Sequence, residues 1–192
     1  LYEAGTVFPE RLDDPAWLDA QYNNRARVAD AMTQLAKWAE ASALVRQRSA
    51  RQMLDLRYGD GPSETLDVFA AAAPNAPVLI YLHGGYWRSL DKSDFSFIAP
   101  SFVADGAMVV VPNYALCPAV SVEDIALQMV KAVAWTWRHA AAHGGNPDRI
   151  ALVGHSAGAH LAAMLLSCRW KQVDEALPLQ PLAGALAISG LY

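Results

Sequence analysis

The stretch Arg149-Ile-Ala-Leu-Val-Gly-His-Ser-Ala-Gly-Ala-His160 decides the fold of this chain. Its apolar residues 150–153 predict a buried strand, and the run 159–167 predicts a helix. Between them, residues 154–158 form Gly-His-Ser-Ala-Gly, in which the glycines keep side chains away from the strand and the helix. A Gly-x-Ser-x-Gly turn between a strand and a helix is typical of a nucleophile elbow, so Ser156 is predicted to be a catalytic nucleophile. The alternative is a strand–turn–helix joint that contains small residues for packing alone.

The size and composition of the chain suit one domain with a substantial core. Its 192 residues are 54% hydrophobic and 18% charged, and the net charge is −4. This mild acidity offers no electrostatic attraction for nucleic acid or an anionic membrane, and no apolar run approaches the roughly 20 residues that span a bilayer. The N-terminus lacks a secretory signal pattern, and two cysteines, Cys117 and Cys168, are too few for a disulfide framework. We therefore expect a cytoplasmic location, with no nucleic-acid partner and no membrane partner.

Short apolar or alternating runs predict the strands, and amphipathic runs predict the helices between them. The predicted strands are 52–58, 65–69, 78–82, 107–111, 150–153 and 183–188. The predicted helices are 13–46, 93–105, 122–142 and 159–167. Asn23-Asn24 is a candidate break in the first helix, and Gly59 and Gly61 mark the turn of a hairpin between the first two strands.

The alternation of strands and helices after this hairpin predicts an α/β fold, with a mostly parallel sheet and helices on both faces. We expect a single domain over 1–192, made of an N-terminal helical segment, 1–48, and a sheet core, 49–192, whose C-terminal strands are missing from this chain. The helical segment is either a cap over the substrate pocket or a layer that packs on the sheet. Ligands bind at the carboxyl ends of the strands in such sheets, which is where Ser156 lies.

A second motif follows the predicted strand 78–82, at the same edge of the sheet. Acyl transfer places negative charge on the former carbonyl oxygen, so backbone N–H groups must already point at it. The stretch His83-Gly-Gly-Tyr-Trp87 lies where such donors are needed, and its glycines let the backbone approach a substrate. We predict an oxyanion hole formed by the N–H groups of Gly85, Tyr86 and Ala157, with the histidine of the motif bracing the loop rather than acting as a base.

With these two motifs, the chain resembles the α/β-hydrolases, and within them the serine-dependent arylformamidases, also called kynurenine formamidases. The stretch 83–87 matches the His-Gly-Gly-x-Trp motif of that family. Further segments that match lie between about residue 16 and the end of the chain: Gln21-Tyr-Asn23, Arg25-Ala-Arg27, Tyr58-Gly-Asp-Gly61, Asn113-Tyr114 and Leu116-Cys-Pro-Ala-Val120. The hormone-sensitive-lipase-like esterases share the early glycine loop, but typically have a third glycine and a Tyr-Arg-Leu-Ala-Pro-Glu-like segment. This chain departs from both features, at 86–87 and at 113–118.

The resemblance implies hydrolysis of N-formylkynurenine to kynurenine and formate through a formyl-enzyme on Ser156. It also implies a pocket for an aromatic substrate, which we expect Tyr86, Trp87 and His155 to line, although packing of Trp87 onto the core is an equal alternative. No cofactor is implied, and no metal-ligand cluster of His and Asp is visible. A carboxylesterase acting on short acyl or aryl esters and a hydrolase-fold binding module without catalysis are the alternatives.

The base and the acid of a catalytic triad are not identifiable in these residues. A serine hydroxyl needs a histidine base oriented by a carboxylate, and in this fold both follow the serine, the acid before the histidine. After Ser156 the chain offers only His160, Asp174 and Glu175 as candidates. His160 is expected to project away from the serine, and both acids precede the last predicted strand. We therefore expect a missing C-terminal portion or a companion chain to supply both residues, and a homodimer is the other partner considered.

Overall fold

The computed structural model describes residues 13–192, and the chain forms two compact units that divide between Trp38 and Ala39. The first unit contains α1 (Pro15–Tyr22), α2 (Asn24–Arg27) and the beginning of α3 (Ala31–Arg48), which continues into the second unit. Asp14 caps α1, because its carboxylate accepts hydrogen bonds from the N–H groups of Ala16 and Trp17 at 3.0 and 3.2 Å.

The segment predicted as helix over 13–46 is interrupted twice. Asn23 ends α1, in agreement with the predicted break. A second interruption, between Val28 and Asp30, is absent from the prediction. Both of these residue types are weaker helix formers than Ala or Leu, which gives a local reason for this break. The division into units falls inside the predicted segment 1–48, and a role of that segment as a cap stays a prediction.

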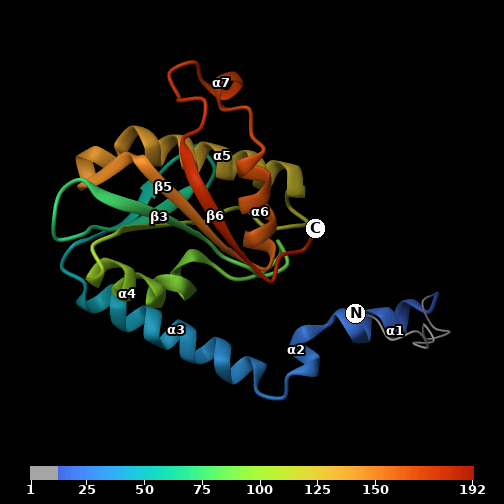
Figure 1. Cartoon of the computed structure of the whole chain (residues 1–192). Helices are drawn as coiled ribbons and strands as arrows, with labels where there is room; N and C mark the ends of the chain where they lie inside the picture. The colour runs from blue at the N-terminus through green and yellow to red at the C-terminus, as the bar shows by residue number, and fades with distance from the viewer. Residues whose placement is uncertain (1–12) are drawn as a thin grey trace, which may run out of the picture. The chain divides into compact units, whose positions relative to one another are not determined.

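The second unit is built on a six-stranded sheet in the order β1-β2-β4-β3-β5-β6 (Figure 1). Its strands are β1 (Gln52–Arg57), β2 (Thr65–Phe69), β3 (Ala76–Leu82), β4 (Met108–Pro112), β5 (Gly145–His155) and β6 (Leu182–Ile188). β1 and β2 form the predicted antiparallel hairpin, and β2 also pairs antiparallel with β4. β4, β3, β5 and β6 run parallel to one another. The sheet is therefore the mostly parallel sheet that the sequence predicts.

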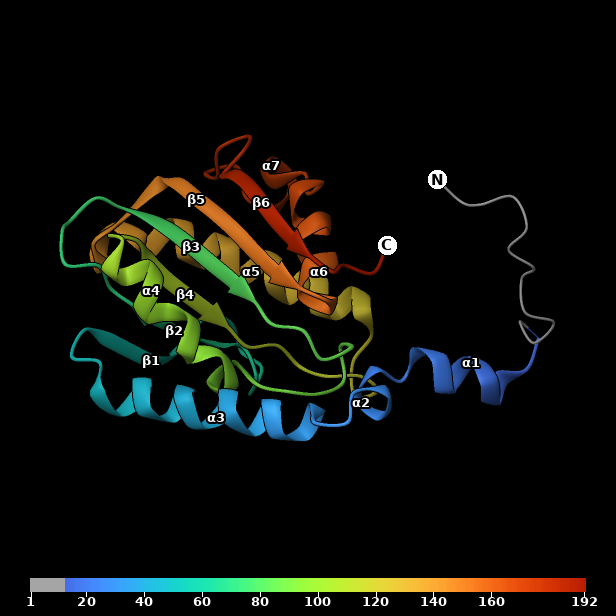
Figure 2. The same ribbon diagram turned by 60° about the horizontal axis from the view of Figure 1, so that its bottom comes forward.

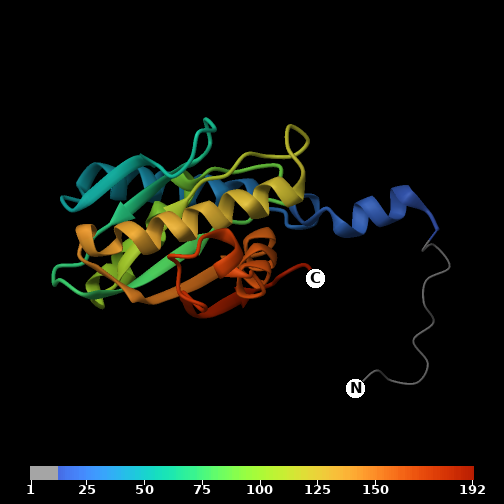
Figure 3. The ribbon, with the colours of Figure 1, turned by 90° about the horizontal axis from the view of Figure 1, so that it is seen from above.

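Helices cover both faces of this sheet, as predicted (Figures 2 and 3). α5 (Val122–His139) and α6 (Ala157–Leu166) lie on one face, and α4 (Ala99–Ala104) lies on the other. Every residue of β4 is buried, because a central strand is covered from both sides. The helix predicted over 93–105 is a 3-10 helix, η1 (Lys92–Ile98), followed by α4, and Pro100 lies at the start of α4, where its N–H is not needed.

The long helix before β5 has well-defined ends. Ser121 and Asp124 form a capping box, in which each side chain accepts a hydrogen bond from the N–H of the other residue. After α5 the helix tightens into η2 (Ala140–His143), and Gly144 ends it with φ 86°, a conformation that favours glycine. The helix predicted over 122–142 is thus confirmed, whereas the short α7 (Trp170–Val173) is absent from the prediction.

The carboxyl ends of β3 and β5 meet at one edge of the sheet. The register pairs Leu82, the last residue of β3, with Gly154 near the end of β5. The segments that follow these two strands begin with His83 and Ser156. The topology therefore brings together the two motifs that sequence reasoning assigns to one site.

Candidate active site

Ser156 occupies a strained turn between β5 and α6. Its backbone has φ 55° and ψ −118°, a conformation that residues with a side chain rarely adopt. Its N–H donates to the carbonyl oxygen of Ile188 in β6 at 2.8 Å, so the turn is held against the neighbouring strand. The next residue, Ala157, begins α6 and is fully buried. A sharp strand-to-helix turn of this kind is the backbone arrangement that the prediction of a nucleophile elbow requires.

Close backbone contacts require both glycines of the elbow. A Cβ atom on Gly154 would lie 2.2 Å from the carbonyl oxygen of Gly158. A Cβ atom on Gly158 would lie 2.0 Å from the carbonyl oxygen of Leu82. Because the obstructing atoms belong to the backbone, they cannot rotate out of the way. α6 therefore packs directly on the end of β3, which fixes Ser156 relative to the loop that follows β3.

The loop after β3 packs against the elbow itself. A Cβ atom on Gly84 would lie 2.8 Å from the carbonyl oxygen of His155 and 3.2 Å from the Cβ atom of Ser156. Gly85 has φ 119°, and a Cβ atom there would lie 2.0 Å from the carbonyl oxygen of Ser89, so only glycine fits. The loop and the predicted nucleophile are therefore in direct contact.

The N–H groups that sequence reasoning assigns to an oxyanion hole are free. Within residues 13–192, the N–H groups of Gly85, Tyr86 and Ala157 donate to no acceptor. Ala157 is the first residue of α6, and the N–H groups at a helix start have no partner inside the helix. The start of α6 also carries the positive end of the helix dipole, which favours a negative charge beside the N–H of Ala157.

His83 is buried and stabilises this loop through ring contacts and hydrogen bonds. Its ring stacks with those of Phe95 and Tyr114, with centroids 5.5 and 4.2 Å away. Nδ1 lies 2.7 Å from the carbonyl oxygen of Gly84, and because a carbonyl can only accept, Nδ1 carries the hydrogen. The Tyr114 hydroxyl donates to the carbonyl oxygen of His83 at 2.8 Å. Burial lowers the pKa of His83, so the ring is neutral at pH 7, and no part of it is exposed to act as a base.

A group of charges, buried at Lys92 and Asp67 and exposed at Asp55, anchors the far end of the same loop. Lys92 Nζ donates to Oδ1 of Asp55 and to Oδ1 of Asp67, at 2.6 Å in each case, and Arg46 also pairs with Asp67. Lys92 and Asp67 are only 3% and 0% exposed. The N–H of Lys92 donates to Oδ1 of Asn113 at 3.2 Å, which ties these charges to the segment after β4. Sequence reasoning misses this group, and its one signal is a charged residue, Asp67, inside the apolar strand β2.

The residues predicted to line a substrate pocket differ in exposure. Tyr86 is 49% exposed, whereas Trp87 and His155 are partly buried. The Trp87 ring meets the Tyr86 ring at a centroid distance of 5.6 Å and the His160 ring edge-on at 5.2 Å. Trp87 also packs on the core, as its structural alternative predicts. His160 therefore contacts the loop through Trp87, and within the described residues it forms no hydrogen bond with the hydroxyl of Ser156.

The acids that follow Ser156 have other partners. The Asp174 carboxylate pairs with Arg138 of α5, whereas for Glu175 the main-chain carbonyl oxygen, not the carboxylate, accepts a hydrogen bond from Lys171 Nζ, at 2.9 Å. In the part of the chain that the structure describes, no histidine or carboxylate is hydrogen-bonded to the hydroxyl of Ser156. The same part holds no cluster of three or more His, Cys, Asp or Glu suited to a metal ion. Over 13–192 there is also no helix whose length and hydropathy would let it cross a bilayer.

Known proteins are similar to this chain in amino-acid sequence. The BD-FAE family model matches residues 66–178, which include the loop after β3 and the elbow. Kynurenine formamidase from Danio rerio is 37% identical over 154 residues, which cover 79% of this chain and 50% of that protein. Esterase LipQ from Mycobacterium tuberculosis is 36% identical over 124 residues, which cover 62% of this chain and 30% of that protein. The chain spans about half the length of the kynurenine formamidases from Danio rerio and Salmo salar.

Solved structures show the same fold. A crystal structure from Silicibacter sp. TM1040, provisionally assigned to the thioesterases, matches with a TM-score of 0.76 and 32% sequence identity. This match covers 91% of the present chain and 63% of the other. Esterase B from Lactobacillus rhamnosis matches with a TM-score of 0.61 and 20% sequence identity. This match covers 80% of the present chain and 55% of the other, and at this identity it shows similarity of fold only. The predicted α/β-hydrolase fold is confirmed.

Proposed function

Because the chain belongs to the BD-FAE family and has the α/β-hydrolase fold, we propose that it carries the nucleophile and the oxyanion hole of a hydrolase that cleaves N-formylkynurenine. The observation that carries this proposal is the direct contact between the loop at Gly84 and the elbow at Ser156. A serine hydroxyl on a strained turn, with free N–H groups beside it, is the arrangement that acyl transfer requires. The 37% identity to a kynurenine formamidase supports a formamide as the substrate.

In the proposed reaction, Oγ of Ser156 attacks the formyl carbon while a general base takes the hydroxyl proton. The carbonyl oxygen becomes an oxyanion, which accepts hydrogen bonds from the N–H groups of Gly85, Tyr86 and Ala157. The C–N bond then breaks, and the base returns its proton to the departing amine of kynurenine. Water attacks the formyl-enzyme by the same route, which releases formate and regenerates the serine.

The general base and its carboxylate are assigned to polypeptide outside these 192 residues. Within the described range no histidine bonds to the hydroxyl of Ser156, and His83 is buried and neutral. A serine without a base is a weak nucleophile, so the proposal needs one from elsewhere. A C-terminal continuation or a companion chain is its proposed source.

The substrate would lie against the exposed side of the loop. Tyr86 is half exposed, and its ring can stack on the aryl group of kynurenine, with Trp87 and His155 completing the wall. A role in tryptophan catabolism follows from this substrate. A cytoplasmic location is also part of the proposal, supported by Cys117 and Cys168, which are both free thiols and suit a reducing compartment.

A carboxylesterase acting on short acyl or aryl esters is the second candidate, favoured by the 36% identity to esterase LipQ. An ester would use the same serine and the same donors, so only the substrate distinguishes the two reactions. A binding module without catalysis is disfavoured by the strained backbone of Ser156, because a turn that only binds has no need of that strain.

The test compares the hydrolysis of N-formylkynurenine and of p-nitrophenyl acetate by the natural full-length protein. Ser156→Ala is expected to lower kcat by on the order of 10³-fold or more. Ser167→Ala, at an exposed serine after α6, is the matched control and should leave kcat unchanged.

The outcomes separate the candidates. Turnover of the ester alone would favour the carboxylesterase, and binding of N-formylkynurenine without turnover of either compound would favour the binding module. A Ser156→Ala variant with undiminished kcat would remove the nucleophile assignment.

A further inference from the structure

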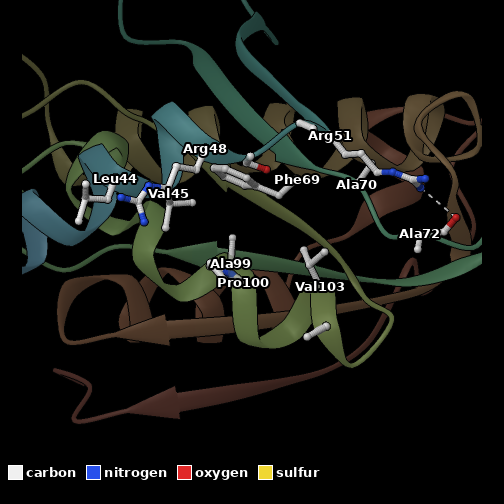
Figure 4. Close-up of a pocket in the computed structure, with 13 residues that line it drawn as sticks. Leu44, Val45, Arg48, Arg51, Phe69, Ala70, Ala72, Ala99, Pro100 and Val103 are labelled. Carbon is white, nitrogen blue, oxygen red and sulfur yellow. Dashed lines mark hydrogen bonds between the residues drawn. The ribbon is translucent and has the colours of Figure 1, made fainter.

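A pocket of about 630 Å³ lies in the second unit, between the end of α3 and α4 (Figure 4). The residues that line it come from α3, from the connection to β1, from the end of β2 and from α4. The volume falls within the range of about 300–1,000 Å³ that is usual for small-molecule sites. None of the lining residues belongs to the elbow or to the loop after β3.

The pocket is separate from the candidate active site. Phe69, which lines it at the end of β2, pairs with Val109 in β4, and this level of the sheet continues through Leu79 to Ala151 of β5. Ser156 lies five residues beyond Ala151, which is about 16 Å along the strand at ~3.3 Å per residue. A small ligand in this pocket would therefore not contact the serine.

The inner surface of the pocket is apolar. Phe69 and Ala99, each only 1% exposed, form its base. Figure 4 shows Phe69 opposite Ala99 and Val103 of α4. Leu44 adds an aliphatic side chain from α3 and is 43% exposed, so apolar surface remains in contact with water. The hydrophobic effect favours a ligand with an apolar body, which would cover this surface.

The charged side chains that line the pocket are arginines, and none of the lining residues is acidic. Figure 4 shows Arg48 and Arg51 on either side of Phe69. Nη1 of Arg51 donates to the carbonyl oxygens of Ala71 and Ala72, at 3.2 and 3.0 Å, which holds this guanidinium in place. Arg48, in the last turn of α3, pairs with no carboxylate within residues 13–192. The pocket therefore combines an apolar base with an uncompensated positive charge.

We propose that this pocket binds a small carboxylate with an apolar chain. The carboxylate pairs with the guanidinium of Arg48, whose planar N–H donors match the two oxygens of a carboxylate. The chain lies over Phe69, against α4. A neutral chain forms no ion pair with Arg48, which is exposed, and a cation is repelled by both arginines, so the charge of the pocket selects the anion. This inference is independent of the function proposed for Ser156.

The test uses octanoate as the probe and the natural full-length protein. Isothermal titration calorimetry gives Kd, and 1-octanol is the neutral control of the same chain length. Amide chemical shifts in NMR spectra locate the site, because a carboxylate could also bind beside the serine. We expect octanoate to shift the amides of residues 44–51 and 99–104. We expect 1-octanol to bind at least about tenfold more weakly, since its neutral hydroxyl forms no ion pair with an arginine.

Substitutions then identify the side chains that bind octanoate. Arg48→Met is expected to raise Kd for octanoate about tenfold, whereas Arg149→Met, at an exposed arginine outside the pocket, should leave it unchanged. Val103→Trp should fill the pocket and abolish binding, and Leu44→Trp at the exposed rim serves the same purpose if the first variant does not fold. Shifts confined to residues around Ser156, equal affinity for 1-octanol, an unchanged Kd in Arg48→Met, or no binding of millimolar octanoate would each overturn the proposal.

Discussion

The substitution Lys92→Met removes a buried cation from between Asp55 and Asp67 while it keeps a long, unbranched side chain. In the native protein, Lys92 Nζ lies 2.6 Å from a carboxylate oxygen of Asp55 and 2.6 Å from one of Asp67. Asp67 is 0% exposed, so water cannot solvate its charge once the lysine is gone. Asp67 keeps two partners, which are Arg46 and the N–H of Asp55 at 2.9 Å.

These contacts set the expected loss in the free energy of unfolding. Removing one partner of a buried ion pair typically costs about 3–5 kcal/mol, because the other charge stays buried. We expect the lower end, about 3 kcal/mol, because Arg46 and the N–H of Asp55 still stabilise Asp67. Lys92 also begins η1, directly after the loop that contains Gly85. The loss should therefore reach the N–H groups proposed as oxyanion donors and lower kcat as well.

The assay is urea unfolding followed by far-UV circular dichroism, which gives the change in the free energy of unfolding. Arg138→Met is the control, since Arg138 pairs with Asp174 and both side chains are partly exposed, at 42% and 32%. An exposed pair contributes at most about 1 kcal/mol. If the two variants differ by less than about 1 kcal/mol, burial does not set the value of these ion pairs and the reasoning is refuted.

Three further predictions concern the elbow and its loop. Gly158→Ala is expected to cost at least about 1–3 kcal/mol of unfolding free energy, because the new Cβ atom would lie 2.0 Å from the carbonyl oxygen of Leu82. Gly184→Ala, with no atom within 4 Å, should change it by less than about 0.5 kcal/mol, and equal effects in urea titrations would contradict the packing argument. Tyr114→Phe is expected to cost about 1–2 kcal/mol, since the carbonyl of His83 loses a buried hydrogen bond, and an unchanged Tm would count against this. Because burial lowers the pKa of His83, below about pH 6.5 the unfolded chain binds a proton that the folded chain does not. The free energy of unfolding should therefore fall from pH 7 to pH 5, and His83→Asn should reduce that slope.

The order of strands and helices in the second unit is readable from local patterns. The apolar runs 78–82 and 150–153 are the buried strands β3 and β5, because a short continuous apolar run reflects burial on both faces. Their ends are less predictable, since pairing with neighbouring strands decides where a strand begins. β5 starts at Gly145, where β3 offers a partner in Ala76, although residues 145–149 have no apolar pattern.

In the candidate site, too, features set by neighbours in sequence are predictable and contacts between distant residues are not. The turn at Ser156 and the glycine loop at Gly84 are predictable, because each depends on neighbours in sequence and on the position of a strand end. The contact between Lys92 and Asp67 is not, since both residues are common on protein surfaces and nothing nearby in the sequence marks them as partners.

The sequence by itself determined the turn at Ser156, the glycine loop at Gly84 and the alternation that makes an α/β sheet, because hydropathy and turn geometry act over a few neighbouring residues. Only the tertiary structure decided which distant groups meet. Tyr114 reaches the carbonyl of His83 across 31 residues, and Lys92 reaches Asp67 across 25. Hydrogen bonds and ion pairs depend on distances in space, and the register of the sheet sets those distances only after the strands have paired.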